Sequence, residues 1–417
     1  MLIDSKTSIC YPKQLNKEMK KIIPFIIFIS FSILCNSQGC GSITKGMLAI
    51  NKSNVEEAQK YFESASKELE DAESNGEKKQ TKCYAKYYYG LGHISLQNYE
   101  KSQVVDLVEK VALLNEAEKY LLKFFDLSYD DKVFATRAIT DMEAVANRQK
   151  GLAIDYYNTA DYQSAMRLFE KAIKNKTRLG DNYLDLHAFE SAAITSSILG
   201  DFEKSLKYIE VLIKNPEMEV NGEKNNQEIN LRRKATYLAG NGDEAKAISC
   251  IDSALKIFPK SLSLKKEKLR IYNEVGNLDS VLVLLEDITQ EIDNDVQMYT
   301  VMGGIYVKKG RLDESYKAYK KALEIDPANK YAIFGLGVYY INKSNEYINT
   351  PDTLSDEESN KVIAEQNKNI DKAIFFFNKY LKIEPGDQQC LKTLKQIYEV
   401  RGDEEKLEEI NKQLATE

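Results

Sequence analysis

Residues 296–327 read VQMYTVMGGIYVKKGRLDESYKAYKKALEIDP, and this stretch decides the fold class. Its first half has the spacing of one helix face, with Tyr299, Met302, Gly303 and Tyr306 on that face. Its second half has the same spacing in Ser315, Tyr319 and Ala322. Gly310 lies between the halves and Pro327 follows the second, and these residue types end helices. The stretch therefore predicts two helices joined by a tight turn.

The same pattern recurs with a period of about 34 residues, which is the length of one helix-turn-helix repeat unit. Successive copies begin at Glu228, Leu262, Val296 and Lys330. In the last of these, the second helix is displaced by an inserted segment, which we place at 343–370. Weaker copies lie upstream, and a good match covers 152–172. A lone helical pair cannot bury its apolar stripe, so such repeats predict a continuous stack.

The pattern resembles the tetratricopeptide repeat (TPR) family, whose signature is W-x-x-L-G-x-x-Y, then A-x-x-x-F, then P. The chain has no Trp for the first position of that signature. The resemblance implies an all-α fold, a right-handed α-solenoid of stacked repeats. It also implies a non-enzymatic scaffold whose first helices line a concave groove and bind a protein or peptide.

The chain divides into four predicted segments. A leader and signal peptide covers 1–39, with a natural start at Met19 as one alternative. Divergent TPR-like repeats with an insertion follow at 40–145. The main array covers 146–387 and contains the insertion at 343–370, and a capping repeat covers 388–417.

The leader has the layout of a bacterial secretory signal. Lysines precede an apolar run from Ile22 to Leu34, which is shorter than the roughly 20 residues that span a bilayer. The stretch Ser37-Gln38-Gly39-Cys40 resembles a lipobox, although Ser37 departs from the usual Leu. We expect export to the periplasm or the outer membrane. Cys40 is the candidate lipidation site and the link to the membrane, and simple cleavage near Ser37 or Gly39 is the alternative.

The spacing of the remaining cysteines indicates no disulfide framework. Cys10 and Cys35 lie in the leader, and Cys83, Cys250 and Cys390 are far apart, without C-x-x-C spacing. We expect those three to act as small buried hydrophobic residues on helices.

No constellation for chemistry is evident in the sequence. His93 and His187, the two histidines, are far apart and are expected to be ordinary half-buried helix residues. There is no P-loop and no G-x-G-x-x-G after a strand. We therefore predict no catalytic residues, no metal site and no cofactor. Without the leader the net charge is −9, which gives no reason to expect nucleic-acid binding.

Two binding surfaces are predicted on first helices. The charged one consists of Arg232, Arg233, Lys266 and Arg270. It would bind an acidic segment, and a merely solvated charged face is the alternative. The apolar one follows from 331–341, which has no charged residue and therefore needs burial on both faces. Its second face consists of Tyr331, Phe334, Val338 and Ile341, extended by Val301 and Val307. Cover by the insertion or by the terminal repeat is the alternative.

The leading functional hypothesis is an exported, membrane-anchored scaffold for a protein or peptide partner. A glycan-binding outer-membrane lipoprotein is the other hypothesis. The absence of Trp weighs against it, but 26 Tyr residues could supply aromatic faces for sugars.

Overall fold

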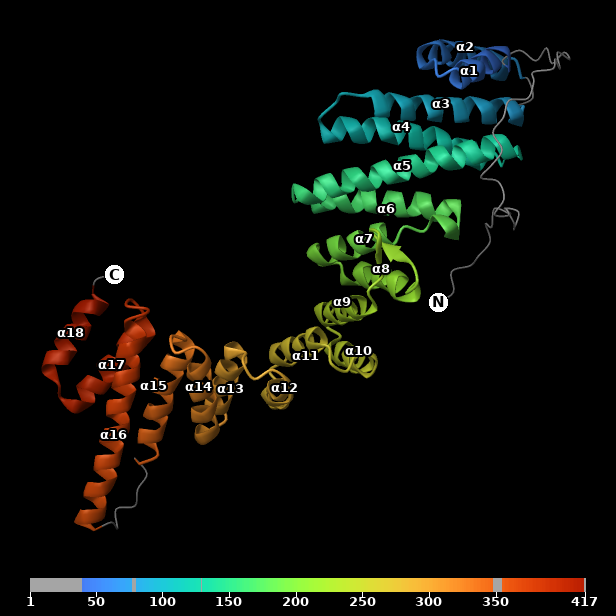
Figure 1. Cartoon of the computed structure of the whole chain (residues 1–417). Helices are drawn as coiled ribbons and strands as arrows, with labels where there is room; N and C mark the ends of the chain where they lie inside the picture. Colours follow the sequence, from blue (N-terminus) through green and yellow to red (C-terminus); the bar gives the residue numbers. More distant parts are fainter. Residues whose placement is uncertain (1–39, 77–79, 129, 348–354, 416–417) are drawn as a thin grey trace. The chain divides into compact units, whose positions relative to one another are not determined.

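A computed structural model describes residues 40–76, 80–128, 130–347 and 355–415, and these residues are almost entirely helical (Figure 1). They form two compact units. The first contains 40–103 and 115–141, and the second contains 104–114 and the described residues from 142 onward. The predicted leader lies outside the described residues, and the four predicted segments stay predictions.

The first unit contains three complete helices and the adjoining parts of two more. The complete helices are α1 (Cys40–Asn51), α2 (Val55–Ser74) and α3 (Thr81–Lys101). The boundary between the units passes through α4 (Leu107–Asp126) and α5 (Lys132–Asn158). Helices α1, α2 and α3 contact one another in pairs, so this unit is a small stack with its own core.

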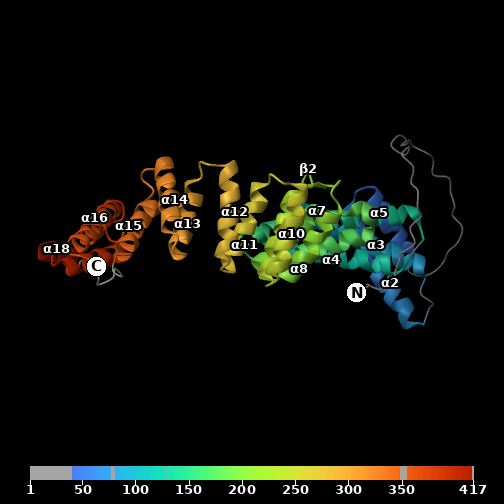
Figure 2. The ribbon, with the colours of Figure 1, turned by 90° about the horizontal axis from the view of Figure 1, so that it is seen from below.

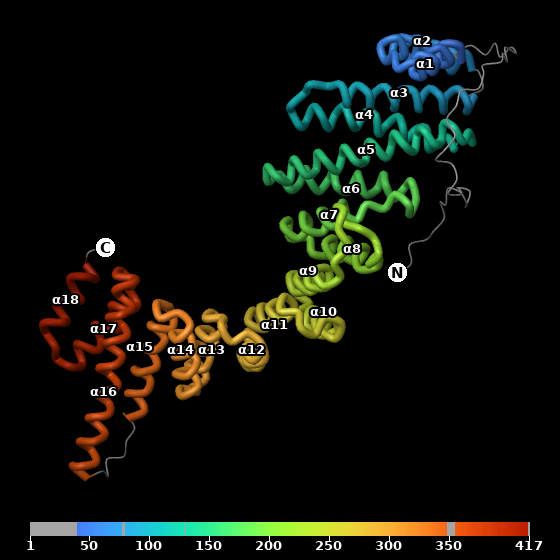
Figure 3. The backbone as a smooth tube through the Cα atoms, viewed as in Figure 1, coloured from blue at the N-terminus to red at the C-terminus, as the bar shows by residue number. Residues whose placement is uncertain are grey.

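The second unit continues with antiparallel helical pairs, which Figure 3 shows as a chain running back and forth. Its first complete helices are α6 (Tyr162–Leu179), α7 (Leu186–Ile198), α8 (Phe202–Lys214), α9 (Gln227–Gly240) and α10 (Glu244–Ile257). They are followed by α11 (Leu262–Glu274), α12 (Leu278–Glu291), α13 (Val296–Lys308), α14 (Leu312–Ile325) and α15 (Lys330–Asn345). The last are α16 (Asp356–Leu381), α17 (Gln388–Arg401) and α18 (Glu404–Leu414). The predicted all-α solenoid of helix-turn-helix repeats is confirmed.

Two short elements interrupt this succession. A 3-10 turn, η1 (Asp181–Tyr183), follows α6. The strands β1 (Glu219–Val220) and β2 (Glu223–Lys224) form an antiparallel hairpin between α8 and α9. The hairpin lies against α7, as Figure 2 shows from below.

The helix boundaries follow the predicted period closely. Helices α11, α13 and α15 begin at Leu262, Val296 and Lys330, as expected, and α9 begins one residue before Glu228. The turns within the pairs use glycines with positive φ, such as Gly276 (71°). Other residue types rarely adopt this backbone conformation, so these glycines favour a turn at their positions, while Ser53 and Ala160 adopt it in the turns after α1 and α5.

The second helix of the inserted repeat also begins where the sequence predicts. The Ser355 side chain accepts from the backbone N–H of Glu358, whose carboxylate accepts from the backbone N–H of Ser355. This capping box stabilises the start of α16, which then runs for 26 residues. Much of the insertion therefore lengthens one helix, while 348–354 lie outside the described residues.

Aromatic rings pack directly onto glycines where helices cross. A Cβ atom added at Gly46 or Gly90 would lie within 2.6 Å of the Phe62 ring, which therefore occupies the space between α1 and α3. The Tyr319 ring is held in the same way between Gly303 and Gly335. The core thus depends on close helix approach at these positions.

The cysteine prediction needs one correction. Cys83 forms a disulfide with Cys40, so it does not act as a free buried thiol. The bridge joins the start of α1 to the start of α3, and the two positions are far enough apart in sequence to hide the pairing. Cys390 is buried, as predicted, and burial raises the pKa of its thiol to about 12.

The glycine contacts generate a stability prediction with an internal control. Gly335→Ala should destabilise the fold by about 1–3 kcal/mol, because the new methyl group would lie 2.2 Å from the Tyr319 ring. At Gly304 a methyl group would meet its nearest neighbour, the Tyr319 hydroxyl, at 3.6 Å. Gly304→Ala should therefore be neutral or stabilising, by up to about 1 kcal/mol. Urea unfolding of both variants checks this, and equal effects would contradict the packing argument.

Candidate ligand-binding surfaces

The predicted charged surface lies on α9 and α11, which contact each other, but most of its cations already have carboxylate partners. Arg233 pairs with Glu190 of α7. Arg270 pairs with Glu267 and Glu274 on its own helix, and Lys266 Nζ lies 3.6 Å from Asp295. An acidic ligand would have to displace these carboxylates. Binding of such a segment here stays a prediction.

Neighbouring polar groups extend this network. The Thr236 hydroxyl donates to Glu267 at 2.8 Å, which links α9 to α11 through a carboxylate that is largely buried. Hydrogen bonds from Ser261 and Ser263, with a smaller contribution from Arg232, lower the pKa of the Glu228 carboxyl. The surface is thus a charge-balanced connection between repeats.

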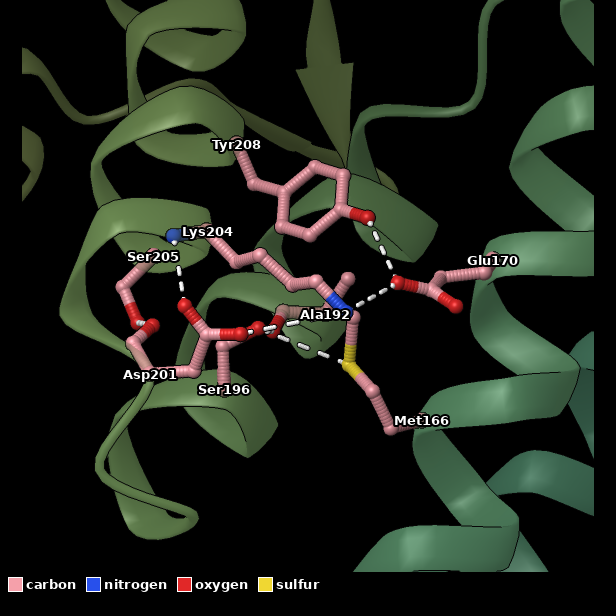
Figure 4. A network of polar contacts seen from close by, with 8 residues as sticks. All are labelled: Met166, Glu170, Ala192, Ser196, Asp201, Lys204, Ser205 and Tyr208. Carbon is pink, nitrogen blue, oxygen red and sulfur yellow. Dashed lines mark hydrogen bonds and ion pairs between the residues drawn. The ribbon is translucent and has the colours of Figure 1, made fainter.

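A second network between repeats joins α6, α7 and α8 (Figure 4). Glu170 of α6 accepts hydrogen bonds from Lys204 at 2.9 Å and from the Tyr208 hydroxyl at 3.4 Å. Burial, together with the charge of Glu170, raises the pKa of Tyr208 to about 12. Because these hydrogen bonds join side chains of α6 and α8, the network holds neighbouring helices together.

In the structure, some residues of the predicted apolar surface are exposed and others are packed against neighbouring helices. Tyr331 is 64% exposed and Val301 is 38% exposed, on the adjacent helices α15 and α13. The Phe334 ring instead lies 5.5 Å from that of Phe377 and 5.1 Å from that of Tyr380, centroid to centroid. Both partners belong to α16, the second helix of the same repeat, and lie beyond 343–370.

The other members of the apolar surface are also packed. Val307, Val338 and Ile341 are half-buried against the cluster formed by the last repeats. They do not form one continuous exposed surface with Tyr331. Peptide binding at this place stays a prediction, and Tyr331 and Val301 are the residues left exposed for it.

Sequence reasoning missed a polar pocket in the first unit. It has a volume of ≈ 530 Å³ and is lined by residues of α1, α3 and α5 among others. His93 Nδ1 lies 2.8 Å from Asp141 Oδ2 in its wall, and the Arg137 guanidinium donates to the Asn51 side chain at 2.9 Å. Both histidines are half-buried, as expected. The signal for this pocket is weak in sequence, because its residues come from the most divergent repeats.

The described residues contain neither a metal-binding cluster nor a helix that could span a membrane. His, Cys, Asp and Glu side chains nowhere gather there into a group of three that could hold a metal ion. No helix in this part of the chain has both the length and the apolar character needed to cross a bilayer.

Comparison with known families supports the repeat assignment. The family described as TPR repeat matches residues 303–343, which span the second half of α13, all of α14 and most of α15. The TPR resemblance inferred from sequence is thereby confirmed. The match covers one stretch of the chain, and the flanking helices of the second unit form the same kind of antiparallel pairs. No curated protein matches the chain in sequence.

The chain is similar to several solved structures at low identity. MamA from Desulfovibrio magneticus (residues 41 to the end) is 18% identical, with 50% of this chain and 98% of that chain covered and a TM-score of 0.36. The C-terminal part of a TPR repeat-containing protein from Cytophaga hutchinsonii is 14% identical, with 63% and 92% covered and a TM-score of 0.47. A TPR repeats protein from Bacteroides fragilis is 15% identical, with 61% and 98% covered and a TM-score of 0.28. Likeness at this level carries no statement about function.

The packing of Phe334 generates a prediction that separates core from surface. Phe334→Ser should destabilise the fold by about 3–5 kcal/mol, because it removes a ring packed between two aromatic partners. Tyr331→Ser on the same helix should change stability by no more than about 0.5 kcal/mol, because that side chain is mostly exposed. Thermal unfolding of the two variants makes the comparison. If the Phe334→Ser protein is as stable as the parent, the packing argument is wrong and Phe334 belongs to the ligand-binding surface.

Proposed function

We propose that the chain is an exported scaffold, located in the periplasm or at the outer membrane, that binds a protein or peptide partner. The observation that carries the export step is the Cys40–Cys83 disulfide. Structural disulfides form and persist in oxidising compartments and are rare in the cytosol of most organisms. The basic, then apolar leader before Cys40 points to the same route.

The partner-binding step is supported by the repeat architecture. The exposed aromatic ring of Tyr331 and the neighbouring Val301 lie on first helices, which in proteins of this family face the groove. Exposed aromatic side chains contribute strongly to protein interfaces. A peptide that contacts α13 and α15 is the binding mode that we propose.

Membrane attachment through Cys40 competes with the disulfide, because the Cys40 sulfur atom can form either a thioether to lipid or a bond to Cys83. A lipid thioether and a disulfide exclude each other at the same residue. If Cys40 carries lipid, Cys83 is left as a free thiol. If Cys40 is bridged to Cys83, the protein is exported without this anchor.

Glycan binding is the second candidate function. The observation that favours it is the polar pocket in the first unit, which has the size of a small-molecule site.

Counting thiols tests the export proposal and the fate of Cys40 together. The full chain is taken from its native cells, denatured and alkylated before and after reduction. An exported, bridged protein should expose two thiols before reduction, Cys250 and Cys390, and four after it. A lipidated protein should expose three and incorporate labelled fatty acid, which Cys40→Ser should abolish.

Both of these outcomes keep the export proposal, and a third contradicts it. If Cys40 and Cys83 both react before reduction and residues 1–39 are still attached, the protein stays in a reducing compartment. The Cys250→Ser variant is the matched control, since it removes one thiol from the count without touching the bridge.

A further inference from the structure

The polar pocket of the first unit holds two cationic side chains that form no ion pair with a described residue, against one carboxylate in its lining. Arg137 and Lys101 both line it, and neither makes an ion pair with any residue that the structure describes. Arg137 donates instead to the neutral amide oxygen of Asn51. The predicted charged surface differs, because Arg233, Lys266 and Arg270 all have carboxylate partners there. The pocket is thus suited to a ligand with negative charge.

The same wall also carries a carboxylate that needs a donor. Asp141 is 9% exposed, and His93 lies against one of its oxygens. Its other oxygen has no hydrogen-bond partner among the described side chains and backbone groups. A ligand made of carboxylate alone would be repelled here, whereas a hydroxyl group can donate to this oxygen.

The rest of the lining combines the apolar or aromatic side chains of Ile50, Val55 and Tyr89 with neutral groups that both donate and accept. Gln97 and Asn51 offer side-chain amides, and Thr140 offers a hydroxyl. Such groups suit hydroxyls, which likewise both donate and accept. The volume, ≈ 530 Å³, lies within the range of about 300–1,000 Å³ that holds small molecules.

We propose that this pocket binds a sugar acid, meaning a small molecule with one carboxylate and several hydroxyl groups. Its carboxylate lies between Arg137 and Lys101, and its hydroxyls bind Asp141, Gln97 and Asn51. The guanidinium of Arg137 exchanges its bond to Asn51 for the ligand carboxylate, which it can grip through two parallel N–H groups. The site does not depend on the proposed binding of a protein partner, since it lies in the other unit.

Matched ligands test each half of this assignment by calorimetry on the full chain. Glucuronate and galacturonate carry both the carboxylate and the hydroxyls, glucose lacks the carboxylate, and acetate lacks the hydroxyls. We expect at least one of the two uronates to bind, and glucose and acetate to bind at least about tenfold more weakly. Glucose binding as tightly as the uronates would overturn the proposal, and so would the failure of both uronates to bind.

Matched variants test the residues. Arg137→Gln and Lys101→Gln should each weaken uronate binding by about ten- to a hundredfold, because each removes a charge-assisted hydrogen bond. Lys52→Gln, which removes an exposed charge next to Asn51 but outside the pocket lining, should leave the affinity unchanged. Equal losses in all three variants would show a general charge effect and overturn the site.

Two further measurements test whether Arg137 and Lys101 have a structural role and whether an acidic peptide is the ligand. The Arg137 and Lys101 side chains are exposed, so the melting temperatures of both variants should equal that of the parent; a large drop would assign these residues a structural role and overturn the site. A short peptide rich in Asp and Glu is the competing ligand. Tighter binding of that peptide than of either uronate, lost in Arg137→Gln, would assign the pocket to an acidic protein segment and overturn the sugar-acid proposal.

Discussion

The close approach of neighbouring helices is the constraint on which the array depends. A lone helical pair leaves its apolar stripe in water, so each pair needs a neighbour, and the neighbour must come near enough to exclude water. Glycines make this possible where an aromatic ring must fit between two backbones, as Phe62 does between Gly46 and Gly90. Tyr319 occupies the same kind of place between Gly303 and Gly335, far along the chain. The repeat survives in divergent sequence because this geometry, rather than a fixed set of residues, is what stacking requires.

Polar groups between repeats follow a second rule, which is that buried charge must be matched. In the second unit Glu170 receives Lys204, and Glu267 receives both Arg270 and Thr236. The Lys204 and Thr236 bonds join neighbouring repeats, while Arg270 pairs with Glu267 within α11. In the pocket of the first unit, the exposed side chains of Arg137 and Lys101 form no ion pair with any described residue, while the buried Asp141 lies in the same wall.

Much of the fold could be predicted from sequence because it is periodic. The starts of α11, α13 and α15 and the capping box at Ser355 follow from local spacing and helix-end chemistry. The orientation of Phe334 could not be predicted in this way. In a helix that is apolar on all sides, the hydrophobic residues do not indicate which face packs against which neighbour. The sequence therefore allows Phe334 to be assigned to the groove, although its ring packs on α16. The pairing of His93 with Asp141, 48 residues apart, is likewise a tertiary contact without a sequence signature.

The Cys40–Cys83 bridge becomes intelligible when the two ends of the described array are compared. The last helix, α18, buries only Ile410 and presents charged residues elsewhere, as a capping element of a repeat array should. At the other end, α1 and α2 contact α3 but, among the described residues, no helix before them. A pair with a neighbour on one side alone gains less burial than an internal pair and opens more readily. A covalent link over a separation of 43 residues contributes about 4 kcal/mol in the chain-entropy description. The bridge therefore stabilises a pair that, among the described residues, has a neighbour on one side alone, and it holds α1 against α3, two of the helices that line the polar pocket.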